Sequence, residues 1–160
     1  MKMTTVAGYV LWALSCKRHA ARIRAEEALA LADDWTGAGA MVELIFPYMV
    51  NRRFSPDDDV RSLTRFIGEY VAATGATGID SHDGETLIRA ALGETVATQA
   101  IAKQFRVKLF LVAAIIHDLE LSPDEVETII AKAEASLTVA GHRFALLSDF
   151  PSVVEPTIGS

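Results

Sequence analysis

Two side chains that could bind a metal, His117 and Asp118, end an apolar run in the segment AAIIHDLEL (residues 113–121). An imidazole and a carboxylate can together hold a divalent ion, and such an ion makes hydroxide available near neutral pH. The same letters also suit the end of a buried helix, because a histidine in the last turn interacts favourably with the negative end of the helix dipole. We expect a helix end here, and a metal site is the alternative.

The longer string LVAAIIHDLEL resembles the metal-binding signature of HD-domain phosphohydrolases, an all-helical family. The resemblance implies a metal site that activates water against a phosphate ester and that an earlier histidine and a later aspartate complete. His82 precedes His117 by 35 residues and fits the first role, and Asp124 or Asp149 fits the second. This alternative therefore predicts metal ligands at His82, His117 and Asp118.

Two very apolar segments suggest contact with another protein. VAGYVLWAL (residues 6–14) is apolar nearly all the way round, although a helix on a domain surface normally needs one apolar face. MVELIFPYMV (residues 41–50) is similarly rich in large apolar side chains. Aromatic and methionine side chains suit a protein interface. The predicted interface residues are Tyr9, Trp12, Met41, Ile45 and Tyr48, and the alternative is that both segments are enclosed in the core.

Glycine and proline divide the rest of the chain into segments with helical spacing. The first helix is predicted from Thr5 to Ala32, and WTGAGA (residues 35–40) is expected to interrupt the helical pattern. Pro47 predicts a kink or a new helix start, because proline lacks an amide donor and clashes with the preceding turn.

Two Ser-Pro-Asp sequences predict helix starts. In FSPDDD (residues 54–59), Ser55 or Asp57 is the expected cap of a helix that ends at Gly75. SPDE at residues 122–125 is a capping box with proline in the first helical position, so it predicts a helix from Pro123 to Ala140.

The remaining segments are a loop, a long apolar stripe and a tail. GATGIDSHDG (residues 75–84) is rich in glycine and predicts a loop. A helical stripe follows from Glu85 to Leu119, and the sequence leaves its continuity open at Gly93 and Phe105. GHRFALL (residues 141–147) is the one candidate strand, and residues 151–160 are expected to form an extended or mobile tail.

Length and composition indicate a folded, single-domain protein. The chain has 160 residues, of which 51% are hydrophobic, enough to bury a core without disulfides. We predict an all-α fold, a single-domain helical bundle of five or six helices over residues 1–150.

The net charge and the cysteine content limit the classes of partner and the compartment that we expect for this protein. The net charge of −6 disfavours nucleic acid as a partner. Cys16 is the only cysteine, which fits a reducing compartment, and we predict a cytoplasmic protein. The apolar run from Val6 to Cys16, about eleven residues, cannot span a bilayer, which needs about twenty. Peripheral membrane contact is therefore only a weaker alternative. The leading prediction is a non-enzymatic interaction, regulatory or adaptor module without a cofactor. It forms a homodimer through the N-terminal helix or binds a protein partner.

Overall fold

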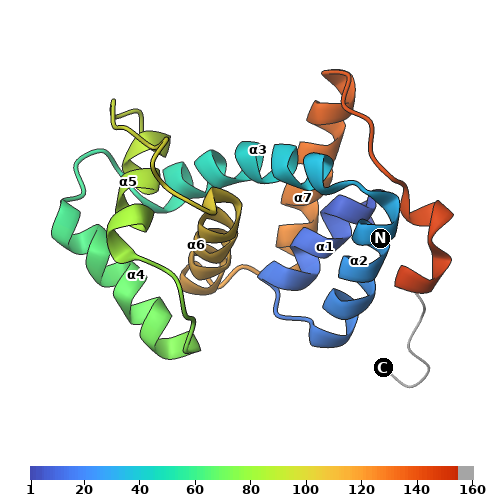
Figure 1. The fold of residues 1–160 in the computed structure, drawn as a ribbon, viewed down its shortest axis with the longest axis horizontal. Coiled ribbons are helices and arrows are strands. Elements are labelled where there is room, and N and C mark those ends of the chain that lie inside the picture. The colour runs from blue at the N-terminus through green and yellow to red at the C-terminus, as the bar shows by residue number, and fades with distance from the viewer. Residues whose placement is uncertain (155–160) are drawn as a thin grey trace. The chain divides into compact units, whose positions relative to one another are not determined.

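The computed structural model describes residues 1–154, and these residues form seven α-helices (Figure 1). The predicted all-α class is confirmed, although the helices outnumber the five or six expected. They are α1 (Val6–Ser15), α2 (His19–Ala32), α3 (Trp35–Arg53), α4 (Val60–Thr74), α5 (Ser81–Ala91), α6 (Gln104–Asp118) and α7 (Pro123–Val139). Two short 3-10 helices follow, η1 (Leu147–Asp149) and η2 (Pro151–Val154). The tail predicted over residues 151–160 is helical at Pro151–Val154, and from residue 155 onward it lies outside the described residues.

The additional helices arise where predicted long helices break. The helix expected from Thr5 to Ala32 is divided into α1 and α2 by Lys17, whose φ of 55° is left-handed. The apolar stripe after Glu85 is divided into α5 and α6. Between these two helices, Gly93 and Lys103 have φ values of 99° and 57°. A left-handed residue cannot continue a right-handed helix, so each of these positions separates two elements.

Side-chain caps set the starts of four helices, α1, α4, α5 and α7. The predicted capping box is confirmed at α7, where the Ser122 hydroxyl accepts from the backbone N–H of Glu125 at 3.2 Å. At α4 the predicted cap is wrong. Asp59 caps that helix instead of Ser55 or Asp57 and accepts from the backbone N–H of Ser62 at 2.7 Å.

Two predicted interruptions are helical in the structure. Asp80 caps α5, so this helix begins at Ser81 and includes His82, which the sequence placed in a loop. WTGAGA begins α3 and does not interrupt a helix, and α3 continues through Pro47 as one element. The side chain of Asn51 donates to the Pro47 carbonyl at 2.8 Å.

The chain forms two compact units, and the first contains residues 1–44 together with the described residues from 121 onward. Within it, α1 packs against α2 and α7 (Figure 1). The candidate strand is reduced to one antiparallel bridge, between Leu146 and Thr5. Beside this bridge the backbone N–H of Val6 donates to the Ala145 carbonyl at 2.9 Å, which holds the C-terminal segment beside the start of α1.

The second unit contains residues 45–120. In it α4 packs against α5 and α6, and α5 also packs against α6 (Figure 1). Each of these three helices contributes fully buried side chains to the core: Leu63, Ile67, Ile88, Leu111 and Ile115. Across the described residues of both units, no helix is long and apolar enough to cross a membrane.

Candidate functional site

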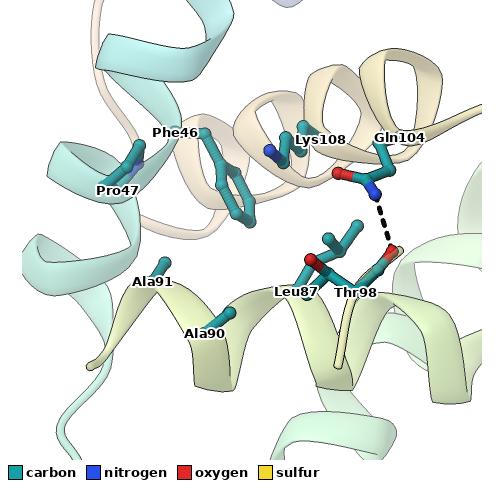
Figure 2. Close-up of a pocket in the computed structure, with 8 residues that line it drawn as sticks. All are labelled: Phe46, Pro47, Leu87, Ala90, Ala91, Thr98, Gln104 and Lys108. Carbon is teal, nitrogen blue, oxygen red and sulfur yellow. Dashed lines mark hydrogen bonds between the residues drawn. The ribbon is translucent and has the colours of Figure 1, made fainter. Parts of the chain in front are cut away.

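The second unit contains a cavity of about 190 Å³, lined by residues of α3, α5, α6 and the loop before α6 (Figure 2). Most of its wall is apolar. The lining residues are Phe46, Pro47, Leu87, Ala90, Ala91, Thr98, Gln104 and Lys108. A concave, mainly apolar surface with a few polar groups is the usual form of a small-molecule site.

The polar groups of the cavity gather on α6. Gln104 and Lys108 are four residues apart, which places them on one face of the helix. The Gln104 side-chain amide donates to the Thr98 carbonyl at 2.7 Å (Figure 2). Lys108 is only 9% exposed, and its Nζ lies 5.7 Å from the centre of the Phe46 ring. The sequence signal for this site is a single charge within the apolar run VKLFLVAA (residues 107–114), and the site was not predicted from it.

The predicted metal ligands make separate contacts. The His82 imidazole lies beside Glu85, with Nδ1 3.4 Å from the carboxylate. His117 packs against the Tyr70 ring, with ring centres 5.8 Å apart, and Asp118 forms an ion pair with Arg53. Over residues 1–154 no three His, Cys, Asp or Glu side chains are grouped so that they could hold a metal ion. The structure therefore does not assemble His82, His117 and Asp118 into one ligand set.

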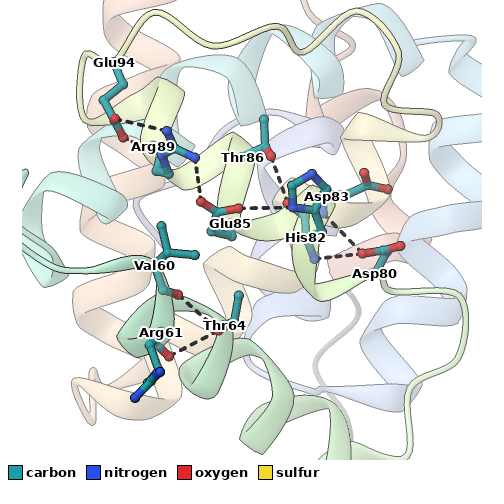
Figure 3. A network of polar contacts seen from close by, with 10 residues as sticks. All are labelled: Val60, Arg61, Thr64, Asp80, His82, Asp83, Glu85, Thr86, Arg89 and Glu94. Atoms are coloured by element: carbon teal, nitrogen blue, oxygen red, sulfur yellow. Dashed lines mark hydrogen bonds and ion pairs between the residues drawn. The ribbon is translucent and has the colours of Figure 1, made fainter.

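His82 belongs instead to a network of charged groups along α5 (Figure 3). Its central carboxylate, Glu85, is 1% exposed and accepts from the Arg89 guanidinium at 2.8 Å. Arg89 also donates to both carboxylate oxygens of Glu94, at 2.6 and 3.2 Å. Asp80 accepts from the backbone N–H groups of His82 and Asp83 and so fixes the first turn of the helix.

The hydrogen bonds of this network stabilise its charged forms. Those to Glu94 and Glu85 raise the pKa of the Arg89 guanidinium above its ordinary value. The hydrogen bond from Arg89 lowers the pKa of Glu94. Arg89 thus gives the buried Glu85 a cationic partner, which a buried carboxylate requires. The arrangement holds the last turns of α5 against the loop that contains Glu94.

Most of the predicted interface residues are used inside the chain, which corrects that prediction. Tyr9, Met41 and Ile45 are 6%, 0% and 6% exposed, so they have almost no surface for a partner. Trp12 is partly exposed, but its indole N–H donates to the Pro123 carbonyl at 3.0 Å and its ring packs against Tyr9. Tyr48, at 53% exposed, is the predicted interface residue that remains well exposed.

A different helix, α2, presents an apolar face to solvent. Ile23 and Leu31 are 52% and 81% exposed. They belong to one exposed stripe at helical spacing, which we call the α2 face: Ala20, Ile23, Glu27, Ala30 and Leu31. The other side of α2 is buried through Ala25, Ala28 and Leu29. This helix therefore exposes large apolar side chains on a second side, with the charged Glu27 between them.

Charge is distributed unevenly along the same helix and the turn before it. The first half is basic, with Lys17, Arg18, His19, Arg22 and Arg24, and the second half is acidic, with Glu26, Glu27 and Asp33. The helix dipole favours the opposite order, with acids at the N-terminus and bases at the C-terminus. Within the helix, Arg22 pairs with Glu26 at 4.0 Å, and the helix dipole does not explain the order of the remaining charges. The exposed apolar residues of α2 were not predicted from the sequence.

No family model matches the chain, and no curated protein or solved structure shows significant similarity to it.

Proposed function

We propose that this protein is a non-enzymatic helical interaction module that forms a homodimer through the α2 face. The observation that carries the proposal is the exposure of Ile23 and Leu31 on a helix whose opposite side is already buried. Large apolar side chains that share one exposed face indicate a protein interface, whereas a single exposed apolar side chain does not. The single thiol, Cys16, supports a reducing compartment such as the cytoplasm.

The charge order of α2 favours a second copy of the chain as the partner. In a two-fold dimer the same patch meets itself, so it must be self-complementary. If two α2 helices pair in antiparallel orientation, the basic first half of one lies beside the acidic second half of the other. The α2 face then lies at the centre of the contact, and the complementary charges flank it.

Substitution of Leu31 by Glu tests the proposal. Each dimer would carry the substitution twice, and a buried leucine contributes about 1.5–3 kcal/mol. We therefore expect Leu31→Glu to raise the dimer dissociation constant by about a hundredfold or more. Sedimentation equilibrium or light scattering over a range of protein concentrations measures this constant.

The matched control is Val139→Glu, because Val139 is 89% exposed and lies outside the α2 face. This variant should dimerise as the wild type does, and circular dichroism should show that both variants are folded. A wild-type chain that stays monomeric at all concentrations would overturn the proposal. So would an equal loss of dimer in the two variants, because the α2 face would then have no specific role.

A further inference from the structure

We propose that the cavity of the second unit binds a small monocarboxylate with an apolar body, whose carboxylate contacts Lys108 and Gln104. This inference does not depend on the proposed dimer, since all the lining residues belong to residues 45–120 and none belongs to α2.

The walls of the cavity indicate the size and the apolar character of the ligand's uncharged part, its body. Phe46, Pro47, Leu87, Ala90 and Ala91 offer hydrocarbon surface (Figure 2). At about 30 Å³ for each water-sized group, a volume of about 190 Å³ accommodates on the order of six such groups. The cavity is smaller than the roughly 300–1,000 Å³ typical of drug-sized ligands. A short aliphatic chain or one aromatic ring fits this space.

The polar end of the cavity determines the charge of the ligand. Lys108 is almost buried, and an ammonium in such surroundings favours a nearby anion. An ammonium has three N–H donors, so it can hold an anion alongside its contacts within the chain. The Gln104 amide has two N–H donors and directs one of them to the Thr98 carbonyl. Its second donor can serve the same anion.

The number of cationic groups favours a carboxylate over a phosphate. Of the residues that line the cavity, Lys108 alone carries a positive charge. Phosphate sites usually combine several donors, such as arginine forks or the N–H groups of a helix N-terminus. One ammonium and one amide match the single charge and two oxygens of a carboxylate.

Asn51 supports the wall where the apolar body would lie. Its side-chain amide donates to the Pro47 carbonyl at 2.8 Å and to the Ala91 carbonyl at 3.1 Å. The second bond connects α3 to the last residue of α5, and Pro47 and Ala91 both line the cavity. The wall is therefore held in place without a ligand, which lowers the ordering cost of binding.

The test compares three probes on the full chain by NMR titration: pentanoate, 1-pentanol and acetate. Pentanoate has both the charge and the body, whereas 1-pentanol lacks the charge and acetate lacks most of the body. We expect pentanoate to bind at least about tenfold more tightly than 1-pentanol, because a hydrogen bond to a charged group is typically worth that factor or more. The same factor is expected over acetate, because acetate lacks three CH2 groups and burial of each is worth about 0.8 kcal/mol. The shifted amides should include Ala90, Ala91 and Lys108. Benzoate, as a fourth probe, distinguishes an aromatic body from an aliphatic one, and tighter binding of either acid supports the proposal.

Variants test whether Lys108 supplies the positive charge that binds the carboxylate. Lys108→Met keeps an unbranched apolar chain and should weaken pentanoate binding by about tenfold without weakening 1-pentanol binding. Lys103→Met, at the exposed N-cap of α6, is the matched control and should bind both probes as the wild type does. The comparison of probes on the wild type needs no variant, so it stands even if Lys108→Met does not fold. Equal binding of pentanoate and 1-pentanol, or binding of neither, would overturn the proposal.

Discussion

At the scale of single residues, the buried carboxylate of Glu134 links α7 to the start of α1. Glu134 is 4% exposed and accepts from the backbone N–H of Thr5 at 2.7 Å and from that of Thr4 at 3.1 Å. Burial raises the pKa of Glu134, and the hydrogen bonds from Thr5 and Thr4 offset this only in part. The folded protein therefore favours the protonated form of Glu134 more than the unfolded chain does.

This raised pKa predicts a pH dependence of stability. The contribution of Glu134 to the free energy of unfolding is fully present below its unfolded pKa, near 4.5, and is lost as the pH rises through its raised folded pKa. Glu134→Gln removes the titration. The stability of the wild type relative to this variant should therefore fall as the pH rises from about 4 and then become constant. Urea unfolding of both proteins across this range measures the difference, and a difference that does not vary with pH would contradict the prediction.

The sequence predicted that His117 lies at the end of a helix, but it did not predict which residues His117 and Asp118 contact. The helix end expected there is confirmed, since α6 ends at Asp118. That prediction was accessible because a helix end is a local property of the sequence. The partners of His117 and Asp118 are Tyr70 and Arg53, which lie about fifty residues or more away along the chain. Such contacts depend on how helices pack, and a single sequence does not specify this.

At the scale of elements, the capping box of α7 allows a direct test of a local motif. The Ser122 hydroxyl accepts from the N–H of Glu125, and the Glu125 carboxylate accepts from the N–H of Ser122 at 2.8 Å. Ser122→Ala removes the first of these bonds and should lower the free energy of unfolding by about 1 kcal/mol. Urea denaturation measures the loss.

Ser55→Ala is the matched control for this substitution. Ser55 also precedes a proline, but it lies in an exposed turn and caps no helix. Its replacement should change stability by less than about 0.5 kcal/mol. An equal loss in the two variants would show that the helix cap has no special role.

Two element boundaries depend on a lysine in a backbone conformation that lysine seldom adopts. Glycine marks the predicted end of α4, and Gly75 indeed has a left-handed φ of 67°. Lys17 and Lys103 adopt the same region of φ, although lysine seldom does. The break at Lys17 was therefore missed, because no glycine or proline marks it, whereas Gly93 marked the break between α5 and α6 and left it open in the prediction.

At the scale of the whole molecule, composition predicted a folded all-α chain but not which apolar surfaces remain exposed. The segment around Tyr9 and the one around Met41 have more apolar side chains than α2, and both are largely buried. The α2 sequence is less apolar overall, yet it exposes Ile23 and Leu31. Apolar content predicts burial, whereas exposure depends on which neighbouring elements cover a helix. That information comes only from the structure.

The proposed dimer also makes a prediction about salt, in which two electrostatic effects oppose each other. Each chain carries a net charge of −6, so two copies repel at a distance, and salt weakens that repulsion. The Debye length is already about 10 Å at 0.1 M salt, so this long-range repulsion is small under ordinary conditions. Antiparallel α2 helices, in contrast, place opposite charges in contact. Each exposed pair contributes about 0.2–1 kcal/mol, and raising the salt reduces this contribution.

We therefore expect the dimer to weaken by roughly threefold or more when salt rises from about 0.1 M to about 1 M. Parallel helices would place like charges together, and the dimer would then strengthen with salt. The double variant Lys17→Glu/Arg18→Glu reverses the charge at one end of the basic half and should remove the weakening. Sedimentation equilibrium at both salt concentrations, on the wild type and on this variant, measures the two dissociation constants. A wild-type dimer that is stronger in high salt would exclude the antiparallel arrangement while leaving the α2 face as the contact. The sign of the salt effect therefore reports the orientation of the two helices separately from their association.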